Sequence, residues 1–262
     1  MENIVLDSLF EPESVAVIGA SRTRGKVGHL VVANLLDAGY QGKIFPVNPS
    51  GGEILGLPVI PALEGLPEGL DLAVVCLPRE QVLGCLEGLA ARRTKAVILI
   101  TAGFKEVGRT GWYLEVQVAA LCLARGMALL GPNCLGLVNT KNGLNATFAA
   151  GNPERGNIAF FSQSGALCLA ILDAALGKGI GFSKFISLGN KAILNETHLL
   201  NYLKDDPETK VILGYVENVV EGQSFLRAAQ EATFAKPVIM IKSGTTAAGA
   251  AWPCWAPTAW AW

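Results

Sequence analysis

The sequence carries almost no net charge: 21 Lys and Arg residues against 22 Asp and Glu residues give a formal charge of −1 over 262 residues. Proteins that bind nucleic acid or an anionic membrane surface concentrate positive charge over a domain or on one face. The balance therefore argues against a large polyanionic partner. We expect neither nucleic acid nor a membrane among its partners.

Close cysteine pairs and a targeting segment are also missing. None of the six cysteines forms a C-x-x-C pair, so a disulfide framework or a zinc site is not expected and no metal site is predicted. Residues 1–7 lack the basic segment, long apolar stretch and cleavage site of a secretion signal, and we expect no membrane-spanning helix. Reduced thiols in a cytoplasmic protein are the expectation.

Strand and helix patterns alternate along the first half of the chain. The length alone favours two domains of about 130 residues each. Short apolar, β-branched runs are typical of buried parallel strands, and the helical patterns between them predict a doubly wound α/β sheet. The strands are expected at 14–18, 43–47, 72–77, 96–100 and 127–130, and the helices at 26–38 and 80–93.

A polar stretch rich in Gly and Asn, residues 139–156, is the expected linker between a first domain of residues 1–138 and a second domain of residues 157–249. The second series again alternates and predicts an open, mainly parallel, flavodoxin-like sheet. Its strands are expected at 158–161, 183–188, 211–216 and 237–241, and its helices at 164–176, 196–203 and 224–235.

The first expected strand runs into a glycine-rich turn, residues 19–28, before the first helix. Such a turn brings backbone N–H groups near a phosphate, and Lys26 adds a point charge. The turn is not G-x-G-x-x-G. The next strand leads into Asn48 and Pro49 instead of the acidic residue that holds a ribose hydroxyl of NAD. A nicotinamide cofactor is therefore the weaker interpretation.

Four short loops follow expected strands, at the edge where open α/β sheets bind their ligands. Each loop alone is ordinary turn chemistry, but their coincidence at one edge favours a CoA-binding domain over an NAD-binding one. The loops are Asn48-Pro49, Leu77-Pro78, Thr101-Ala102-Gly103-Phe104 and Gly131-Pro132-Asn133.

Ser162, Gln163, Ser164 and Gly165 follow an expected strand and precede an apolar helical run. Two hydroxyls and free N–H groups at a helix start suit an anion, although one serine capping the helix is the simpler alternative. Glu217 stands at another expected strand end, where a carboxylate can accept a hydrogen bond from an imidazole. Its alternative is a solvated carboxylate.

Across about residues 1–250 the chain resembles the α portion of ADP-forming acyl-CoA (acetyl-CoA) synthetases, relatives of the succinyl-CoA synthetase α subunit. The most specific marks are Gly131-Pro132-Asn133-Cys134 and Ser162-Gln163-Ser164-Gly165, and the further matches Gly189-Asn190-Lys191-Ala192 and Tyr215-Val216-Glu217 come in the same order. The resemblance implies a Rossmann-like CoA-binding domain followed by a flavodoxin-like ligase domain.

The resemblance further implies a ligase that interconverts acyl-CoA, ADP and phosphate with acid, CoA and ATP through a phosphohistidine. The Ser162 to Gly165 loop would bind phosphate, and Glu217 would support the phosphohistidine. The residues that would contact CoA as substrate are Gly19, Ser21, Lys26, Asn48, Pro49, Leu77, Pro78, Gly103 and Asn133. The acyl group stays open, because Ile193-Leu194-Asn195-Glu196 is less acidic than in many relatives.

The expected phosphohistidine has no counterpart, since no histidine follows His198 and residues 250–255 read AAWPCW. His29 and His198 are expected to be structural or solvated. No Walker motif occurs, so ADP, ATP and Mg²⁺ would belong to an ATP-grasp portion, supplied by a β subunit or further C-terminal domains in an oligomer. The alternatives are a non-catalytic CoA-binding regulatory module, which would need neither Glu217 nor the Ser162 loop, and an NAD-binding Rossmann protein.

Residues 243–262 break every earlier pattern: they carry no charge, four of the five tryptophans and two prolines. Tryptophan favours membrane interfaces, but this segment is short, broken by proline and without basic residues. We expect residues 250–262 to be a non-native or frameshifted end. Sequencing the source DNA tests this, and an intact reading frame that encodes the same end would refute it.

Overall fold

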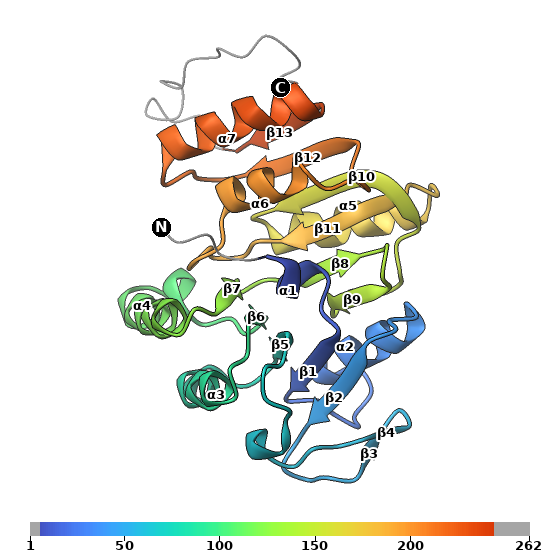
Figure 1. Cartoon of the computed structure of the whole chain (residues 1–262), viewed down its shortest axis with the longest axis vertical. Helices are drawn as coiled ribbons and strands as arrows, with labels where there is room; N and C mark the ends of the chain where they lie inside the picture. Colours follow the sequence, from blue (N-terminus) through green and yellow to red (C-terminus); the bar gives the residue numbers. More distant parts are fainter. Residues whose placement is uncertain (1–5, 244–262) are drawn as a thin grey trace.

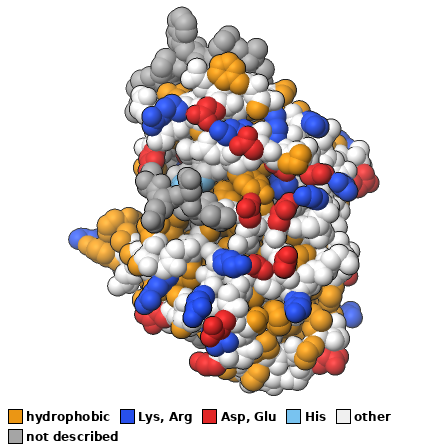
Figure 2. All heavy atoms as spheres, viewed as in Figure 1, with side chains coloured by type: hydrophobic (Ala, Val, Ile, Leu, Met, Phe, Trp, Pro, Cys, Tyr) orange, Lys and Arg blue, Asp and Glu red, His pale blue; other side chains and the backbone are white. Residues whose placement is uncertain are grey.

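The computed structural model describes residues 6–243 as two α/β halves, one above the other along the long axis (Figure 1). The expectations for residues 1–5 and 244–262, including the unusual tail, lie outside the described residues. On the face shown in Figure 2, acidic and basic side chains are interspersed instead of gathered by sign.

The first sheet is fully parallel, with strand order β2-β1-β5-β6-β7. An isolated parallel bridge from Val47 to Ile60 adds a rudimentary strand outside β2, next to a short hairpin, so the order approaches that of a Rossmann sheet. The strands are β1 (Ser14–Ile18), β2 (Lys43–Val47), β5 (Leu72–Val75), β6 (Ala96–Leu99) and β7 (Ala128–Leu130), and the hairpin is β3 (Glu53–Ile54) with β4 (Leu57–Pro58).

Both faces of the first sheet are buried, which explains its continuous apolar strands. Val15 and Val17 of β1 belong to the core cluster that includes α2, whereas Ala16 and Ile18 belong to the cluster on the side of α3 and α4. None of the helices within residues 6–243 is long and apolar enough to cross a membrane. The helices of this half are α1 (Asp7–Phe10), α2 (Val27–Asp37), η1 (Leu63–Gly65), α3 (Arg79–Ala91), η2 (Lys105–Val107) and α4 (Arg109–Ala124).

The second sheet has the order β13-β12-β10-β11-β8-β9. Its four later strands are parallel and follow a flavodoxin-like order, while β8 and β9 form an antiparallel hairpin at the edge beside β11. The elements are β8 (Gly136–Asn139), β9 (Leu144–Thr147), β10 (Arg155–Ser162), α5 (Gly165–Leu176), β11 (Phe182–Ser187), α6 (Glu196–Leu203), β12 (Val211–Val216), α7 (Gly222–Ala235) and β13 (Val238–Lys242). The predicted fold class, two open and mainly parallel α/β sheets, is confirmed.

The expected linker, residues 139–156, is instead largely ordered structure, because it contains β9 and the end of β8. Its asparagines are internal hydrogen-bonding groups: Asn139 Nδ2 donates to Phe10 O at 2.9 Å, and Asn145 Nδ2 donates to Asn152 Oδ1 at 2.6 Å. From the first half, Asn34 Nδ2 of α2 donates to the carbonyls of Thr147 and Ala149, both at 2.8 Å. The polar composition of residues 139–156 thus reflects buried hydrogen bonds at the contact between the two halves.

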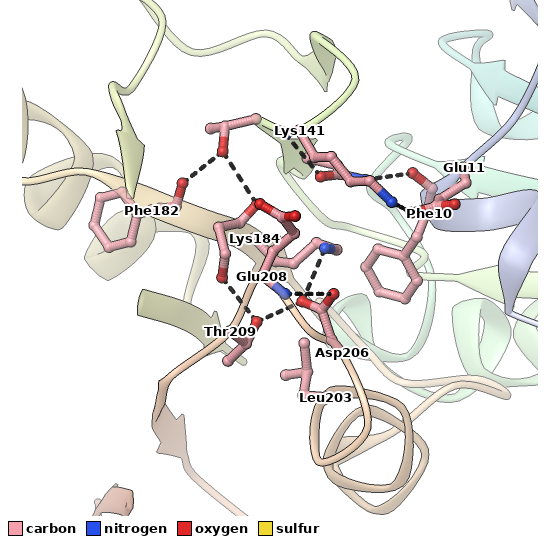
Figure 3. A network of polar contacts seen from close by, with 12 residues as sticks. Phe10, Glu11, Lys141, Phe182, Lys184, Leu203, Asp206, Glu208 and Thr209 are labelled. Atoms are coloured by element: carbon pink, nitrogen blue, oxygen red, sulfur yellow. Dashed lines mark hydrogen bonds and ion pairs between the residues drawn. The ribbon is translucent and has the colours of Figure 1, made fainter. Parts of the chain in front are cut away.

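A buried ion pair lies near the amino end of the second sheet (Figure 3). Lys184 Nζ of β11 lies 2.9 Å from Asp206 Oδ2, and the two side chains are 0% and 6% exposed. Thr209 Oγ1 donates to the same carboxylate at 2.5 Å. Burial alone would raise the pKa of Asp206, but the hydrogen bonds from Thr209 and Lys184 outweigh it and hold the pKa below its usual value.

We expect Lys184→Met to lower the free energy of unfolding by about 3–5 kcal/mol, because the Asp206 carboxylate would remain buried without its cation. Urea unfolding followed by circular dichroism at neutral pH measures the loss. In acid the pair weakens in the wild type. Its contribution is complete above the pKa of unfolded aspartate, about 4, and is lost as the pH falls through the lowered pKa of Asp206.

Lys204→Met is the control, because the Lys204–Glu231 pair, at 2.6 Å, is exposed on the glutamate side. Surface pairs contribute little, so this variant should unfold close to the wild type. Equal losses in the two variants would contradict the assignment of the buried pair as a stabilising contact.

Candidate functional site

The glycine-rich turn presses the start of α2 against the end of β1. A Cβ added to Gly28 would lie 2.0 Å from Gly19 O, and Gly19 itself has φ +88°, in the left-handed region. Lys26 precedes α2 and forms no side-chain cap. His29 N donates to Lys26 O at 2.9 Å, but the N–H groups of Val27 and Gly28 have no acceptor within residues 6–243 and are open to a ligand, where the helix dipole favours an anion.

The structure brings Ser21 and Asn48 together beside this turn. Asn48 Nδ2 donates to Ala20 O at 2.8 Å, which ties the loop after β2 to the loop after β1. Ser21 Oγ accepts from Thr23 N at 3.1 Å, while Lys26 and Pro49 are exposed at the rim. Arg22, which we did not predict, donates from Nε to Glu53 O at 3.1 Å and fixes the β3–β4 hairpin over the turn.

The loops after β5, β6 and β7 are linked in a row at the carboxyl edge of the first sheet. Thr101 Oγ1 donates to Leu77 O at 2.7 Å, and Asn133 N donates to Thr101 O at 2.9 Å. Pro78 immediately precedes α3, and Gly103 O accepts from Arg79 Nη1 at 3.0 Å. The predicted residues of these three loops thus form one continuous rim.

A cavity of about 350 Å³ opens between this rim and the start of α5. Its lining is mostly apolar, with polar groups from a few loop residues, as in small-molecule sites. The cavity connects two regions that the sequence predicted separately, the loops at the carboxyl edge of the first sheet and the Ser162 to Gly165 loop. Its lining includes Leu77, Thr101 and Asn133 from the first half and Phe148, Gly165 and Leu169 from the second.

The loop between β10 and α5 divides its two serines between different tasks. Ser164 Oγ accepts from Leu167 N at 3.3 Å and so caps α5, as the simpler alternative holds. Ser162 is buried, and its Oγ accepts from Ser164 N at 3.0 Å. Space remains open at Gly165, since a Cβ added there would meet no atom within 4 Å. An anion can therefore approach the first turn of α5.

Gln163, which we expected among the phosphate ligands, has a different role in the structure. Its backbone N–H donates to Tyr215 O at 3.1 Å, and its side-chain Nε2 donates to Glu196 and Asn218 O. All its donors are engaged within the protein. The side chain ties the end of β10 to the loop after β12 and leaves no N–H for a ligand.

Glu217 follows β12, which pairs directly with β10. The strand order reverses between these two strands, and ligands of open α/β sheets bind at such a reversal. Its carboxylate is exposed and forms no hydrogen bond or ion pair within residues 6–243. It is available to a ligand, beside the Ser162 to Gly165 loop.

The two histidines are engaged locally. His29 Nδ1 lies 3.0 Å from Ser21 O, and His198 Nδ1 lies 2.8 Å from Asn195 Oδ1 in the capping box of α6. Burial lowers the pKa of His198, with Glu221 and Glu196 opposing it. Within residues 6–243, no group of three or more His, Cys, Asp or Glu side chains is placed to hold a metal ion.

Sequence reasoning missed a polar cluster between the two halves. Asn190 Nδ2 donates to Glu106 Oε2 at 2.6 Å and to Glu115 Oε2 at 2.8 Å, and Lys105 Nζ lies 3.3 Å from Glu115. Burial would raise the pKa of Glu106, but hydrogen bonds from Asn190 and backbone N–H groups lower it overall. The Asn190 motif was visible in the sequence, but its partners lie 75 and 84 positions away.

Two family profiles match the two halves: "CoA binding domain" over residues 13–140 and "Succinyl-CoA ligase like flavodoxin domain" over residues 155–254. Together with the relatives described next, these matches show that the chain belongs to the family of the α portions of ADP-forming acyl-CoA synthetases. The predicted resemblance is confirmed.

Individual relatives support the same family assignment. The chain is 44% identical to acetate–CoA ligase (ADP-forming) I of Archaeoglobus fulgidus, over 94% of this chain and 36% of the relative. It is 41% identical to the α subunit of acetate–CoA ligase (ADP-forming) I of Pyrococcus furiosus, over 94% and 54%. A solved acetyl-coenzyme A synthetase 1 of Ca. Korarchaeum cryptofilum, in complex with phosphate and ADP, superposes with TM-score 0.90 at 39% identity, over 94% and 53%. The chain thus spans between about a third and about half of these relatives.

We expect Gly28→Ala to lower the free energy of unfolding by about 1–3 kcal/mol, because the new methyl group collides with Gly19 O and forces α2 away from β1. Thermal and urea unfolding measure the effect. Gly84→Ala in α3 is the control: its Cβ meets nothing within 4 Å, so a helical alanine there should stabilise slightly. Loss of stability in both variants would contradict the close-approach argument.

Proposed function

We propose that this chain is the CoA-binding and phosphate-binding portion of an ADP-forming acyl-CoA ligase, which interconverts acyl-CoA, ADP and phosphate with acid, CoA and ATP. The observation that carries the proposal is the cavity of about 350 Å³ that lies between the carboxyl rim of the first sheet and the start of α5. It lets a thioester held by the first half meet an anion held by the second.

In this proposal the first half binds CoA. The uncapped start of α2 and Lys26 attract the phosphates of CoA, and Ser21 and Asn48 shape the turn around them. Leu77, Pro78, Gly103 and Asn133 form the rim along which the rest of CoA reaches the cavity. The cavity's apolar lining excludes water from the thioester.

The second half holds phosphate or an acyl phosphate at the first turn of α5, where the helix dipole and the free N–H groups favour negative charge. The unengaged Glu217 carboxylate orients a phosphorylated histidine by accepting its ring N–H, and that histidine has to come from outside this sequence, since none follows His198. ADP, ATP and Mg²⁺ are bound by an ATP-grasp portion, either a β subunit or further domains. The name of the P. furiosus relative as an α subunit supports such a partner.

Titration calorimetry of the purified chain with CoA, and in parallel with NADH, tests this function. We expect saturable CoA binding that weakens about tenfold in Lys26→Ala and in Ser21→Ala, because a charge-assisted or polar contact at the turn is lost. Lys43→Ala is the matched control. Lys43 is also exposed, but it is the first residue of β2 and so lies at the amino end of the strands, away from the glycine-rich turn.

Failure of a folded sample to bind CoA would refute the proposal. Tight NADH binding without CoA binding would replace it with a nicotinamide-linked function. An equal loss of affinity in Lys43→Ala would show that the binding is not at the glycine-rich turn.

A further inference from the structure

The loop that carries Glu217 is held by a buried network. Gln163 Oε1 accepts from Glu217 N at 2.8 Å and from Asn218 N at 3.1 Å, and Gln163 Nε2 donates to Asn218 O at 2.8 Å. Lys191 Nζ donates to the same carbonyl at 2.7 Å. Four hydrogen bonds from two side chains therefore fix an exposed two-residue segment.

The two side chains that hold this loop share a third partner. Glu196 Oε2 accepts from Gln163 Nε2 at 3.3 Å and from Lys191 Nζ at 3.0 Å. The side chains of Lys191 and Glu196 are 5% and 2% exposed. Burying an ion pair costs free energy that hydrophobic packing would not. An orienting role explains why the pair is buried despite this cost in free energy, because Lys191 and Glu196 together fix the orientation of the Gln163 side-chain amide.

Lys191 is also held from the other side. It has φ +59°, a strained conformation for a lysine, and it follows Asn190, whose side chain contacts Glu106 and Glu115 of the first half. Asn133 Nδ2, on the cavity rim, donates to Asn190 Oδ1 at 3.3 Å. Adjacent residues thus contact the CoA-side rim and the Glu217 loop, so Asn190-Lys191 links the two sites.

We propose that Lys191 and Gln163 are positioning residues, which together with Glu196 hold the Glu217 loop and the Ser162 to Gly165 loop at a fixed separation. This inference rests on the proposed function, because the separation matters only if the two loops share one phosphoryl group. Gln163 lies within one loop and binds the backbone of the other, so its amide sets their spacing. Lys191 keeps that amide in place without contacting the ligand.

The variant Lys191→Met tests the role in the full chain, with the amide hydrogen exchange of Glu217 and Asn218 measured by NMR. Ile212, a buried amide earlier in β12, is measured in parallel, because local opening of the loop raises only the rates of Glu217 and Asn218, whereas a general loss of stability raises the rate of Ile212. We expect the exchange rates of Glu217 and Asn218 to rise about tenfold or more. Inorganic phosphate should bind about tenfold more weakly, while CoA affinity should change by less than about twofold.

Lys184→Met is the matched control, because Lys184 forms a second buried lysine–carboxylate pair, at 2.9 Å from Asp206 (Figure 3), near the amino end of the sheet, whereas Glu217 follows the carboxyl end of β12. It should reduce stability and raise the exchange rate of Ile212, while the exchange rates of Glu217 and Asn218 stay unchanged. The double variant Lys191→Met with Glu196→Gln removes both charges and serves if the single variant does not fold. It still lacks the contact from Lys191 Nζ to Asn218 O and should keep the raised exchange rates of Glu217 and Asn218.

Unchanged exchange rates of Glu217 and Asn218 and unchanged phosphate affinity in the Lys191 variants would refute the positioning role, as would the same rise in these two rates in Lys184→Met. A wild-type chain that is folded but binds neither CoA nor phosphate would instead refute the proposed function. Failure of the positioning role and failure of the proposed function can therefore be distinguished. The first is measured by amide exchange in the Glu217 loop, and the second by ligand binding to the wild type.

Discussion

Parallel strand pairing is the constraint on which the rest of this structure depends. Because β1 pairs in parallel with β5, and β10 with β12, the loops that carry the polar residues of each half emerge at a single edge of its sheet. A site then needs only one further condition, that the two edges face each other. The cavity between Asn133 and Gly165 fulfils that condition.

The β8–β9 hairpin fixes how the two edges meet. It forms the edge of the second sheet and accepts hydrogen bonds from Asn34 of α2, so the first half packs directly on it. One core cluster runs from Val15 in β1 to Met240 in β13. The Asn190-Lys191 loop adds a polar contact at the cavity side. Both apolar and polar contacts therefore join the halves, and each half also has a core cluster of its own.

Local pattern predicted most of the fold. The strand at 14–18 and the helix at 196–203 have the expected bounds, because buried parallel strands and capped amphipathic helices leave a strong local signal. The linker expected at residues 139–156 is instead ordered. Its buried asparagines donate to backbone carbonyls, but by composition alone they look the same as the asparagines of a solvated loop. The local pattern predicted Glu217 and the Ser162 loop each at the end of a strand, but that β10 and β12 are neighbours at the switch point is known only from the strand order of the structure. The role of Gln163 depends on Glu196 and Asn218, which only tertiary structure brings near.

The hairpin has a consequence for how the protein gains its structure during synthesis. The ribosome delivers the whole first sheet before β8 and β9, yet one flank of α2 stays uncovered until that hairpin is made. The hairpin in turn rests on β11, which is translated later still. The exposed apolar flank of α2 in the nascent amino-terminal half is therefore buried only after residues further along the chain have been synthesised. Folding of the first half is thus coupled to chain as far downstream as β11.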